Sequence, residues 1–378
     1  MLKGAGTRIL AVFWRVSVIF GQTYKDRRVL VTGHTGFKGS WLALWLEGLG
    51  ATVTGYALAP PTEPSHFERL SLKANSILAD VRDRASLERV MREAQPEIVF
   101  HLAAQPIVLE SYTDPLGTLS TIVTGTANLL DVCRSVESVR AVVIVTTDKV
   151  YENREWAWGY RENEALGGHD PYSASKACAE IVTSSFRRSF FEKDGEAAAM
   201  VASARAGNVV GGGDWSLHRL VPDVMRAISN GEAARIRNPY SSRPWQHVLE
   251  PLSGYLALGA GLFEGRKELA EAWNFGPDPS SNLVTSEVCE LMEKSWPAIK
   301  CEFAPVNGAP HEAGLLMLDS AKARHSLSWR PVWDVETTIQ RTIEWYRAFY
   351  ERDTLLTQEQ IDAYGEEART LGVPWATA

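Results

Sequence analysis

Paired cysteines, metal-ligand spacings and excess positive charge are all missing from this chain of 378 residues. Its four cysteines, Cys133, Cys178, Cys289 and Cys301, form no CxxC pair, and its eight histidines show no ligand spacing. This pattern argues against a disulfide framework and a zinc site, and it fits a reducing cytoplasm. We therefore predict no bound metal and a cytoplasmic location.

Basic side chains are outnumbered, with 39 Lys and Arg against 46 Asp and Glu, a formal net charge of −7. Such a surface has no general attraction for nucleic acid or an anionic membrane, although it can still hold a local basic pocket. Long hydrophobic runs are also missing, because the apolar stretch at 8–20 is short and is interrupted by Arg15. We predict a small-molecule partner and an exposed N-terminal extension over residues 1–23.

Short apolar strands alternate with amphipathic helices in the first half of the chain. The strand candidates are 28–32, 52–58, 97–103, 141–147 and 199–205, and the helical stretches are 39–48, 84–94, 115–134 and 172–192. Strand, helix, strand order of this kind requires right-handed crossovers and a parallel sheet, so we predict a doubly wound α/β (Rossmann) fold. After about residue 206 glycine and proline interrupt the rhythm, and apolar spacing predicts one further helix over 334–351.

A glycine-rich turn, GHTGFKG, follows the first strand and opens a helix with Gly33, Gly36 and Gly39. Glycines there let the backbone turn tightly and approach a pyrophosphate, whose charge meets the helix amino terminus. A plain strand-to-helix turn is the alternative, but the position between strand and helix favours dinucleotide binding. The second strand ends GYALAPP, with neither an acidic residue for a ribose nor a basic residue for a 2′-phosphate, and we favour NAD. Further along, Asp80 either accepts from the adenine amino group or belongs to a helix cap or turn.

A second motif, YSASK, places Tyr172 and Lys176 on one face of a helix. A neighbouring ammonium favours phenolate, so we expect the pKa of Tyr172 to fall towards neutrality, as a general base requires. The full set of predicted cofactor-binding residues is Gly33, Thr35, Gly36, Phe37, Gly39, Asp80, Val81, Ala103, Tyr172 and Lys176.

A third motif, TTDKVYEN, follows the apolar run AVVIV and sets Asp148 beside Lys149. The pair is expected at the carboxyl end of a buried strand, where open parallel sheets collect ligands. A solvated turn or a surface ion pair is the alternative to a chemical role.

These motifs together with HLAAQP resemble the extended short-chain dehydrogenase/reductases, and the later blocks RAGNVVGGGDW and RPWQHVLEPLSGYL are similar to the CDP-glucose 4,6-dehydratase branch. The resemblance runs from about residue 24 to the carboxyl end. It implies an NAD-binding domain over 24–205, extended by 245–266, and a smaller mixed α/β lobe over 206–378 that binds a nucleotide sugar. It also implies a lyase of deoxysugar biosynthesis, of the kind that supplies sugars for lipopolysaccharide O-antigen.

The resemblance further implies how such a lyase works. Tyr172 takes the sugar 4-hydroxyl proton while the C4 hydride passes to NAD, Lys176 holds the nicotinamide ribose, and Thr147 bonds the 4-oxygen. Water leaves across C5 and C6 with Asp148 as acid, and hydride then returns to C6. Lys149 is the C5 base if its amine is neutral, and an electrostatic stabiliser of the enolate if it is charged.

Substrate contacts are expected, by the same resemblance, from Gln105, Asn208, Arg219 and Arg243, because arginine donates bidentately to phosphate oxygens. His101 in HLAAQP is expected to be packed and hydrogen-bonded instead. The sequence departs from the family at Ile122, where relatives carry asparagine, and at Leu109 and Glu110, where relatives tend to carry arginine.

Two alternatives stay open. A sugar-nucleotide 4-epimerase shares the tyrosine, the lysine and NAD but needs no acid and base at the strand end, and a non-enzymatic NAD-sensing scaffold needs only the glycine turn. The helices at 115–134 and 172–192 would suit an isologous homodimer, or a dimer of dimers.

Overall fold

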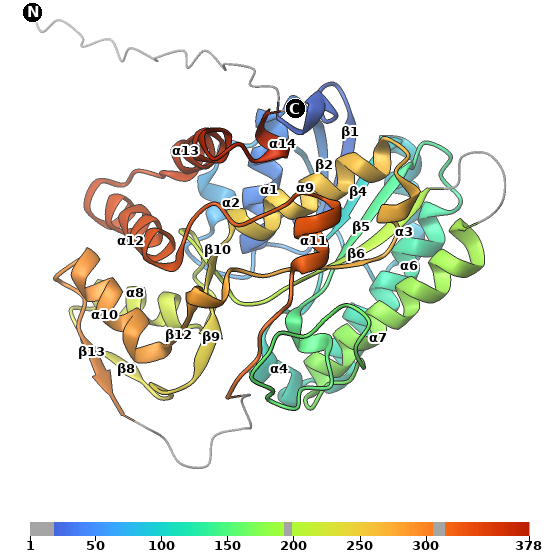
Figure 1. Ribbon diagram of the computed structural model, residues 1–378. Coiled ribbons are helices and arrows are strands. Elements are labelled where there is room, and N and C mark those ends of the chain that lie inside the picture. The colour runs from blue at the N-terminus through green and yellow to red at the C-terminus, as the bar shows by residue number, and fades with distance from the viewer. Residues whose placement is uncertain (1–18, 193–198, 305–313, 378) are drawn as a thin grey trace, which may run out of the picture.

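A seven-stranded parallel sheet forms the centre of the computed structural model, which describes residues 19–192, 199–304 and 314–377. The strand order is β11-β6-β5-β4-β1-β2-β3 (Figure 1). The strands are β1 (Arg28–Thr32), β2 (Thr52–Ala57), β3 (Asn75–Leu78), β4 (Ile98–His101), β5 (Ala141–Val145), β6 (Met200–Ala206) and β11 (Ala272–Phe275). All six pairings are parallel, so the predicted doubly wound fold is confirmed.

Strand β5 shows why helices cover both faces of the sheet. All five of its residues are buried; Ala141, Val143 and Val145 join one core, and Val142 and Ile144 join the other. Successive strand side chains point to opposite faces, so a strand apolar on both needs a helical layer on each. Figure 1 shows these layers. One consists of α1 (Phe37–Gly48) and α9 (Leu249–Phe263), and the other of α3 (Arg84–Ala94), α6 (Gly125–Cys133) and α7 (Pro171–Phe186).

Short elements continue or connect these helices. The predicted helix at 115–134 is built from α5 (Pro115–Leu119), a π-helical segment η2 (Ser120–Thr124) and α6, and the one at 172–192 is α7 with the π-helical η4 (Arg187–Phe191). The remaining short segments near the sheet are α2 (His66–Arg69), α4 (Val108–Thr113), η3 (Asp148–Val150) and η5 (Lys267–Leu269). No helix within the described ranges is both long and apolar enough to cross a lipid bilayer.

A smaller lobe lies beside the carboxyl ends of the strands (Figure 1). It contains three two-stranded pairings, of which β7 with β10 and β8 with β13 are parallel, and β9 with β12 is antiparallel. Its strands are β7 (Val209–Val210), β8 (Ala234–Ile236), β9 (Ser242–Pro244), β10 (Gln246–His247), β12 (Asn282–Val284) and β13 (Cys301–Phe303). Its helical segments are α8 (Leu220–Ser229), η6 (Pro279–Ser281), α10 (Thr285–Ser295) and α12 (Val335–Arg352), whereas α11 (Ala321–Ser326) packs against β11 of the large sheet.

The two parts of the chain interleave more than the sequence predicts. Strand β11 is an edge strand of the large sheet, beside β6, although the predicted division places it in the smaller lobe. The C-terminal helices α13 (Thr357–Thr370) and α14 (Pro374–Thr377) return to the N-terminal end, where Trp375 stacks on Phe20 with ring centroids 4.9 Å apart. Most of the predicted extension, residues 1–18, lies outside the described residues. Its described end, which includes the 3₁₀ turn η1 (Phe20–Gln22), is packed, since Phe20 is buried.

A buried carboxylate fastens α9 to the C-terminal helices. Glu250 accepts hydrogen bonds from the backbone nitrogens of Val332 at 3.0 Å and Trp333 at 2.8 Å, and from the Tyr364 hydroxyl at 2.7 Å. Burial raises the pKa of Glu250 to about 7, against the opposing effect of these three donors. One side chain thus holds three segments that are distant in sequence.

Replacing Glu250 by alanine should destabilise the fold. Two buried backbone N–H groups and a buried phenol lose their acceptor, and we expect the free energy of unfolding to fall by about 3 kcal/mol or more. Urea denaturation followed by tryptophan fluorescence measures this. Glu268→Ala is the control, because that side chain is 61% exposed and forms an ion pair with Arg266 on the same surface turn. Equal losses of unfolding free energy in the two variants would contradict the assignment.

The same carboxyl should give the stability a pH signature. Its pKa of about 7 lies above the ordinary 4.5, so its contribution is full below about pH 4.5 and is lost as the pH rises through 7. Buried histidines with lowered pKa values act in the opposite direction, so the useful quantity is the difference between wild type and Glu250→Gln. We expect the wild-type advantage to shrink by about 2 kcal/mol between pH 5 and pH 7.

Candidate functional site

One cavity of about 1000 Å³ lies at the carboxyl ends of the sheet strands, where the smaller lobe faces the sheet. The residues that follow β1, β4 and β6 line it, as do residues of α8 and β9. It holds the predicted positions Gly33, Thr35, Gly36, Phe37, Gly39, Asp80, Val81, Ala103, Thr147, Lys149, Tyr172, Lys176, Asn208, Arg219 and Arg243. Predictions from four separate motifs thus converge on a single space.

The glycine-rich turn leaves room for a ligand at the start of α1. Gly33 has φ +75°, and a Cβ there would approach the Ala103 nitrogen to 2.8 Å, so only glycine fits. Gly36, which precedes the helix, supplies no side-chain cap to its first N–H groups. The Thr35 hydroxyl does not cap the helix either, because it donates to the Leu58 carbonyl at 2.9 Å. Free N–H groups at a helix amino terminus are what a pyrophosphate needs.

Asp80 reaches the same cavity but already has a partner. Its carboxylate accepts from the Arg82 backbone nitrogen at 2.8 Å and from the Arg82 guanidinium at 2.6–3.0 Å. Hydrogen bonding from Arg82 lowers its pKa. The cap of α3 is Asp83, not Asp80, since Asp83 accepts from the Ser86 nitrogen. Asp80 therefore belongs to a turn held by an ion pair, at the adenine end of the predicted cofactor path.

The turn at residues 147–150 follows β5 directly, and it is called the catalytic turn below because it carries the predicted catalytic residues. Thr147 caps η3, and its hydroxyl accepts from the Lys149 nitrogen at 3.4 Å and donates to Asp148 Oδ1 at 2.9 Å. Asp148 is 3% exposed and does not line the cavity, and a Cβ on Gly207 would come within 2.7 Å of its Oδ2. The predicted pair is therefore split, with Lys149 on the wall and Asp148 packed behind it.

Burial of Asp148 favours its acid form, against the effect of the cations around it. Burial raises its pKa above the ordinary value, while Lys149, the Thr147 hydroxyl, Arg243 and Lys38 act in the opposite direction. A carboxyl that is held protonated to higher pH suits the role of proton donor.

Tyr172 and Lys176 come together as predicted, but the expected fall in the tyrosine pKa is wrong for this structure. Burial raises the pKa of Tyr172 to about 12, although the Thr147 hydroxyl and Arg219 oppose the rise. Lys176 points its ammonium at the Val145 carbonyl, 3.1 Å away, and burial lowers its own pKa to about 8. Desolvation is the largest cause of the rise in the Tyr172 pKa, and residue spacing alone does not reveal it.

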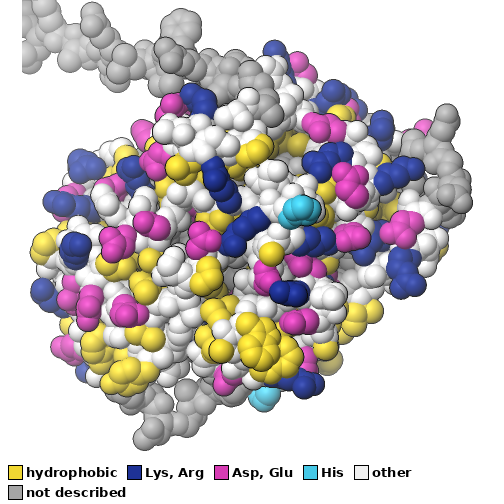
Figure 2. Space-filling view, viewed as in Figure 1, with side chains coloured by type: hydrophobic (Ala, Val, Ile, Leu, Met, Phe, Trp, Pro, Cys, Tyr) yellow, Lys and Arg dark blue, Asp and Glu magenta, His cyan; other side chains and the backbone are white. Residues whose placement is uncertain are grey.

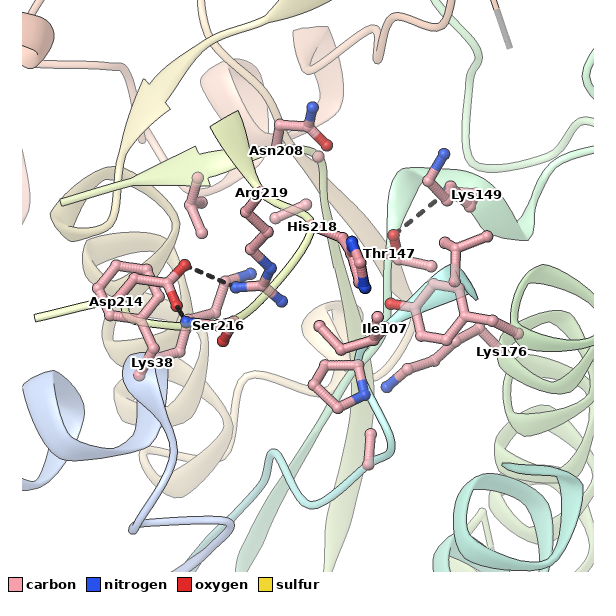
Figure 3. Close-up of a pocket in the computed structure, with 18 of the residues that line it drawn as sticks. Lys38, Ile107, Thr147, Lys149, Lys176, Asn208, Asp214, Ser216, His218 and Arg219 are labelled. Carbon is pink, nitrogen blue, oxygen red and sulfur yellow. Dashed lines mark hydrogen bonds and ion pairs between the residues drawn. The ribbon is translucent and has the colours of Figure 1, made fainter. Parts of the chain in front are cut away.

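The wall opposite the catalytic turn carries Asn208, Asp214 and Arg219 (Figure 3). Asp214 accepts from Arg219 at 2.8 Å and thereby holds the guanidinium in place. Arg243, on β9, donates to the Ser242 carbonyl at 2.8 Å. Gln105 is not on the cavity wall, because its amide donates to Thr118 at 3.0 Å and accepts from the Ile107 nitrogen. The structure therefore gives no support to Gln105 as a substrate contact.

Two further residues line this cavity and were not predicted. Lys38 lies inside the quoted motif GHTGFKG, and burial, with Arg219 and Lys176, lowers its pKa to about 7. His218 precedes Arg219 and has φ +64°, a backbone strain uncommon outside glycine. Lys38 lies in the same motif as Gly33, Thr35, Gly36, Phe37 and Gly39, but the sequence predicts a cofactor contact only for those five. His218 had no sequence signal, since its strain appears only in the fold.

His101 and Ile122 lie near the cavity and contribute to packing there. His101 is buried and bonds Thr32 at 2.7 Å and Thr126 at 3.2 Å, as predicted. Ile122 is 1% exposed and packs with Tyr172 and Ala179, so it forms an apolar contact beside the predicted base. Over the described ranges, no cluster of three or more His, Cys, Asp or Glu is placed to hold a metal ion.

Solved structures share this architecture. An epimerase from Methanothermobacter thermautotrophicus, Mth375, aligns with a TM-score of 0.77 over 91% of this chain and 98% of its own, at 22% identity. A UDP-glucose 4-epimerase from Thermotoga maritima aligns with a TM-score of 0.72 over 85% and 99%, also at 22% identity. At these identities the similarity establishes the fold alone.

Sequence comparison is more specific. A CDP-glucose 4,6-dehydratase from Salmonella typhimurium is 48% identical over 350 residues, which cover 90% of this chain and 97% of that protein. A dTDP-glucose 4,6-dehydratase from the same organism is 26% identical, over 85% and 93%. The model of the family described as GDP-mannose 4,6 dehydratase matches residues 30–260. The chain therefore belongs to this dehydratase family of the extended short-chain dehydrogenase/reductases.

Proposed function

We propose that the protein is a CDP-glucose 4,6-dehydratase, a lyase that converts CDP-D-glucose to CDP-4-dehydro-6-deoxy-D-glucose and water. The observation that carries the proposal is the buried Asp148 beside Thr147 and Lys149, on the same strand end that Tyr172 and Lys176 approach. The 48% identity to a CDP-glucose 4,6-dehydratase over most of both chains supports this substrate. A 4-epimerase or an NAD-sensing scaffold would have no use for that acid.

NAD is the cofactor, and the cavity fits it. Gly33 and the uncapped start of α1 would hold the pyrophosphate, Asp80 and Val81 would lie at the adenine, and Lys176 would hold the nicotinamide ribose. When bound, NAD accepts and returns a hydride, and its positive ring lowers the pKa of a phenol beside it. That positive charge would oppose the burial that raises the pKa of Tyr172.

The first half of the reaction is an oxidation at C4 of the sugar. Tyr172 would take the proton of the 4-hydroxyl, and Thr147 would bond the same oxygen, while bound NAD would accept the C4 hydride. Asn208, Arg219 and Arg243 would hold the nucleotide diphosphate, so that the sugar reaches the catalytic turn. The product of this half is a 4-ketone, which makes the C5 proton acidic.

The second half eliminates water and restores the cofactor. Asp148, which lies behind the wall, would supply the proton for the departing 6-hydroxyl through the Thr147 hydroxyl, which bonds its Oδ1 and lines the cavity. The C5 proton would pass to an amine of the cavity wall. Lys149 is that amine if it is neutral; as an ammonium it would instead stabilise the enolate. Hydride returns to C6, a proton returns to C5, and the net change is the loss of one water.

The substrate assignment can be tested with a panel of sugar nucleotides. We expect the purified protein with NAD to remove water from CDP-glucose, and in deuterated water to place deuterium at C5, as seen by mass spectrometry and NMR. An epimerase leaves the mass unchanged. If CDP-, dTDP-, GDP- and UDP-hexoses all remain intact, the protein is not a dehydratase, and if only another nucleotide reacts, the base assignment is wrong.

Asp148→Asn should abolish the elimination step selectively. The amide cannot donate a carboxyl proton to the leaving hydroxyl, and loss of a general acid costs about 10²–10⁴-fold in rate. We expect turnover of CDP-glucose to fall by this factor with NAD content and thermal stability retained. Asp131→Asn, at an exposed ion pair on α6, is the control. Water elimination at a near-normal rate by Asp148→Asn would remove Asp148 from the role of acid.

We infer a homodimer, or a dimer of such dimers, built on α5 and α7. Leu116 on α5 is 77% exposed and Ile181 on α7 is 56% exposed, on two helices that contact each other. Apolar side chains on adjacent helices suit an isologous helical interface. The double variant Leu116→Glu with Ile181→Glu should yield monomers in light scattering, while Leu371→Glu, at another exposed leucine, should not. A monomeric wild type would contradict the inference.

A further inference from the structure

A buried ion pair lies behind the catalytic turn, outside the reaction cavity. Glu180 on α7 and Arg205 on β6 approach to 2.9 Å, and each side chain is 3% exposed. Neither residue lines the cavity described above, so neither touches substrate or cofactor there. A buried pair of this kind gives little net stability to the fold. Its hydrogen bonds to neighbouring segments are therefore the more informative feature.

Both flanks of the catalytic turn are fastened to this pair. Thr146, which precedes the turn, donates to Glu180 Oε1 at 2.5 Å. Tyr151, which follows it, accepts from Arg205 Nη1 at 2.7 Å and donates to Asn274 of β11 at 2.7 Å. The segment that carries Thr147, Asp148 and Lys149 is therefore hydrogen-bonded, through the residues at its two ends, to a single ion pair.

Glu180 also acts on the helix that carries the proposed base. It lies four residues after Lys176, on the same helical face, and its negative charge opposes the burial that lowers the pKa of Lys176 to about 8. Glu180 itself stays ionised: burial opposes this, but Arg205 and hydrogen bonds from Ser203 and Thr146 outweigh burial and lower its pKa.

We propose that Glu180 is a positioning residue for the reaction, which fixes the turn of Thr147 and Asp148 through Thr146 and maintains the charge of Lys176. The inference rests on the function proposed above. If Glu180 had a purely structural role, a side chain of the same shape would be sufficient, with or without the charge. The two roles differ in what happens when the charge is removed but the shape is kept.

Glu180→Gln makes that change. We expect kcat for CDP-glucose to fall by about 100-fold, because small displacements of a catalytic group cost about this much, with KM nearly unchanged. The alkaline limb of the kcat profile should move to lower pH, because Lys176 then loses its proton earlier. Ser203→Ala is the matched control: it removes a 2.6 Å hydrogen bond to Glu180 and keeps the charge, so kcat and the profile should stay close to wild type.

A direct titration separates this effect from other groups. Lys38 of α1 and His101 of β4 also face Lys176, but both remain in every variant, and His101 has a pKa of about 3 and is neutral throughout. The pH dependence of Lys176 acetylation, in the full chain freed of nucleotide, should have its midpoint at lower pH in Glu180→Gln than in wild type and Ser203→Ala. Equal acetylation midpoints and equal losses of kcat in Glu180→Gln and Ser203→Ala would overturn the proposal.

Two further results keep the test decisive. If Glu180→Gln does not fold, Thr146→Val breaks the link to the catalytic turn while keeping Glu180, and it should lower kcat without moving the Lys176 midpoint. Wild-type kcat in Thr146→Val would overturn the positioning role. A wild type inactive on CDP-glucose would instead refute the proposed function, and the Lys176 titration would still report on Glu180.

Discussion

The protein keeps polar and charged groups buried at the end of β5, and the rest of the site depends on how they are compensated. Thr146, Thr147 and Asp148 are each less than a tenth exposed, directly after a strand that is apolar on both faces. Every such group needs a partner, since an unpaired buried polar group costs free energy. The partners come from α7 and β6 as well as from the turn itself, so catalysis and packing share the same contacts.

The doubly wound topology supplies these partners. Parallel strands bring all their carboxyl ends to one edge, so β1, β4, β5 and β6 present their following residues to one cavity. The chain then leaves the sheet to build part of the lobe, returns as α9 and β11, and builds the rest. Because β11 also carries Asn274, which accepts from Tyr151, the late return of the chain helps to fix the catalytic turn. Figure 2 shows basic and acidic side chains interspersed on the viewed face, and the cavity wall carries the basic side chains Lys38, Lys149, Lys176, Arg219 and Arg243.

The sequence predicts the features that depend on local pattern. The five predicted strands are present because their apolar runs are continuous, and α3 matches its predicted range because Asp83 caps it and the apolar face is regular. Strands β3 and β11 were not predicted, since NSIL is largely exposed at a sheet edge and AWNF is separated from the other strands by lobe residues. Their pairing is decided by tertiary contacts, not by composition.

Site chemistry was predictable in identity but not in environment. Motifs placed Tyr172, Lys176 and Thr147 at one cavity, yet spacing alone could not show that Asp148 is packed behind the wall or that Gln105 folds back onto its own loop. The tyrosine pKa was predicted in the wrong direction because spacing reveals a neighbouring charge but not the loss of water around it. Burial is a property of the whole fold, and it is the largest cause of the pKa shifts of Tyr172, Lys176 and Asp148.

This dominance explains why the same site can be both stable and reactive. Burial makes Tyr172 a poor base and Lys176 a weaker cation when they are considered alone, with pKa values of about 12 and about 8. A positive charge brought next to the phenol is far more effective in such a desolvated space than in water. By the proposed mechanism, Tyr172 would stay protonated until a bound oxidised cofactor supplied that charge, and proton removal from the sugar would then be tied to the presence of NAD. Glu180 contributes to this coupling, because a Lys176 that stayed neutral would leave one of the two required charges missing.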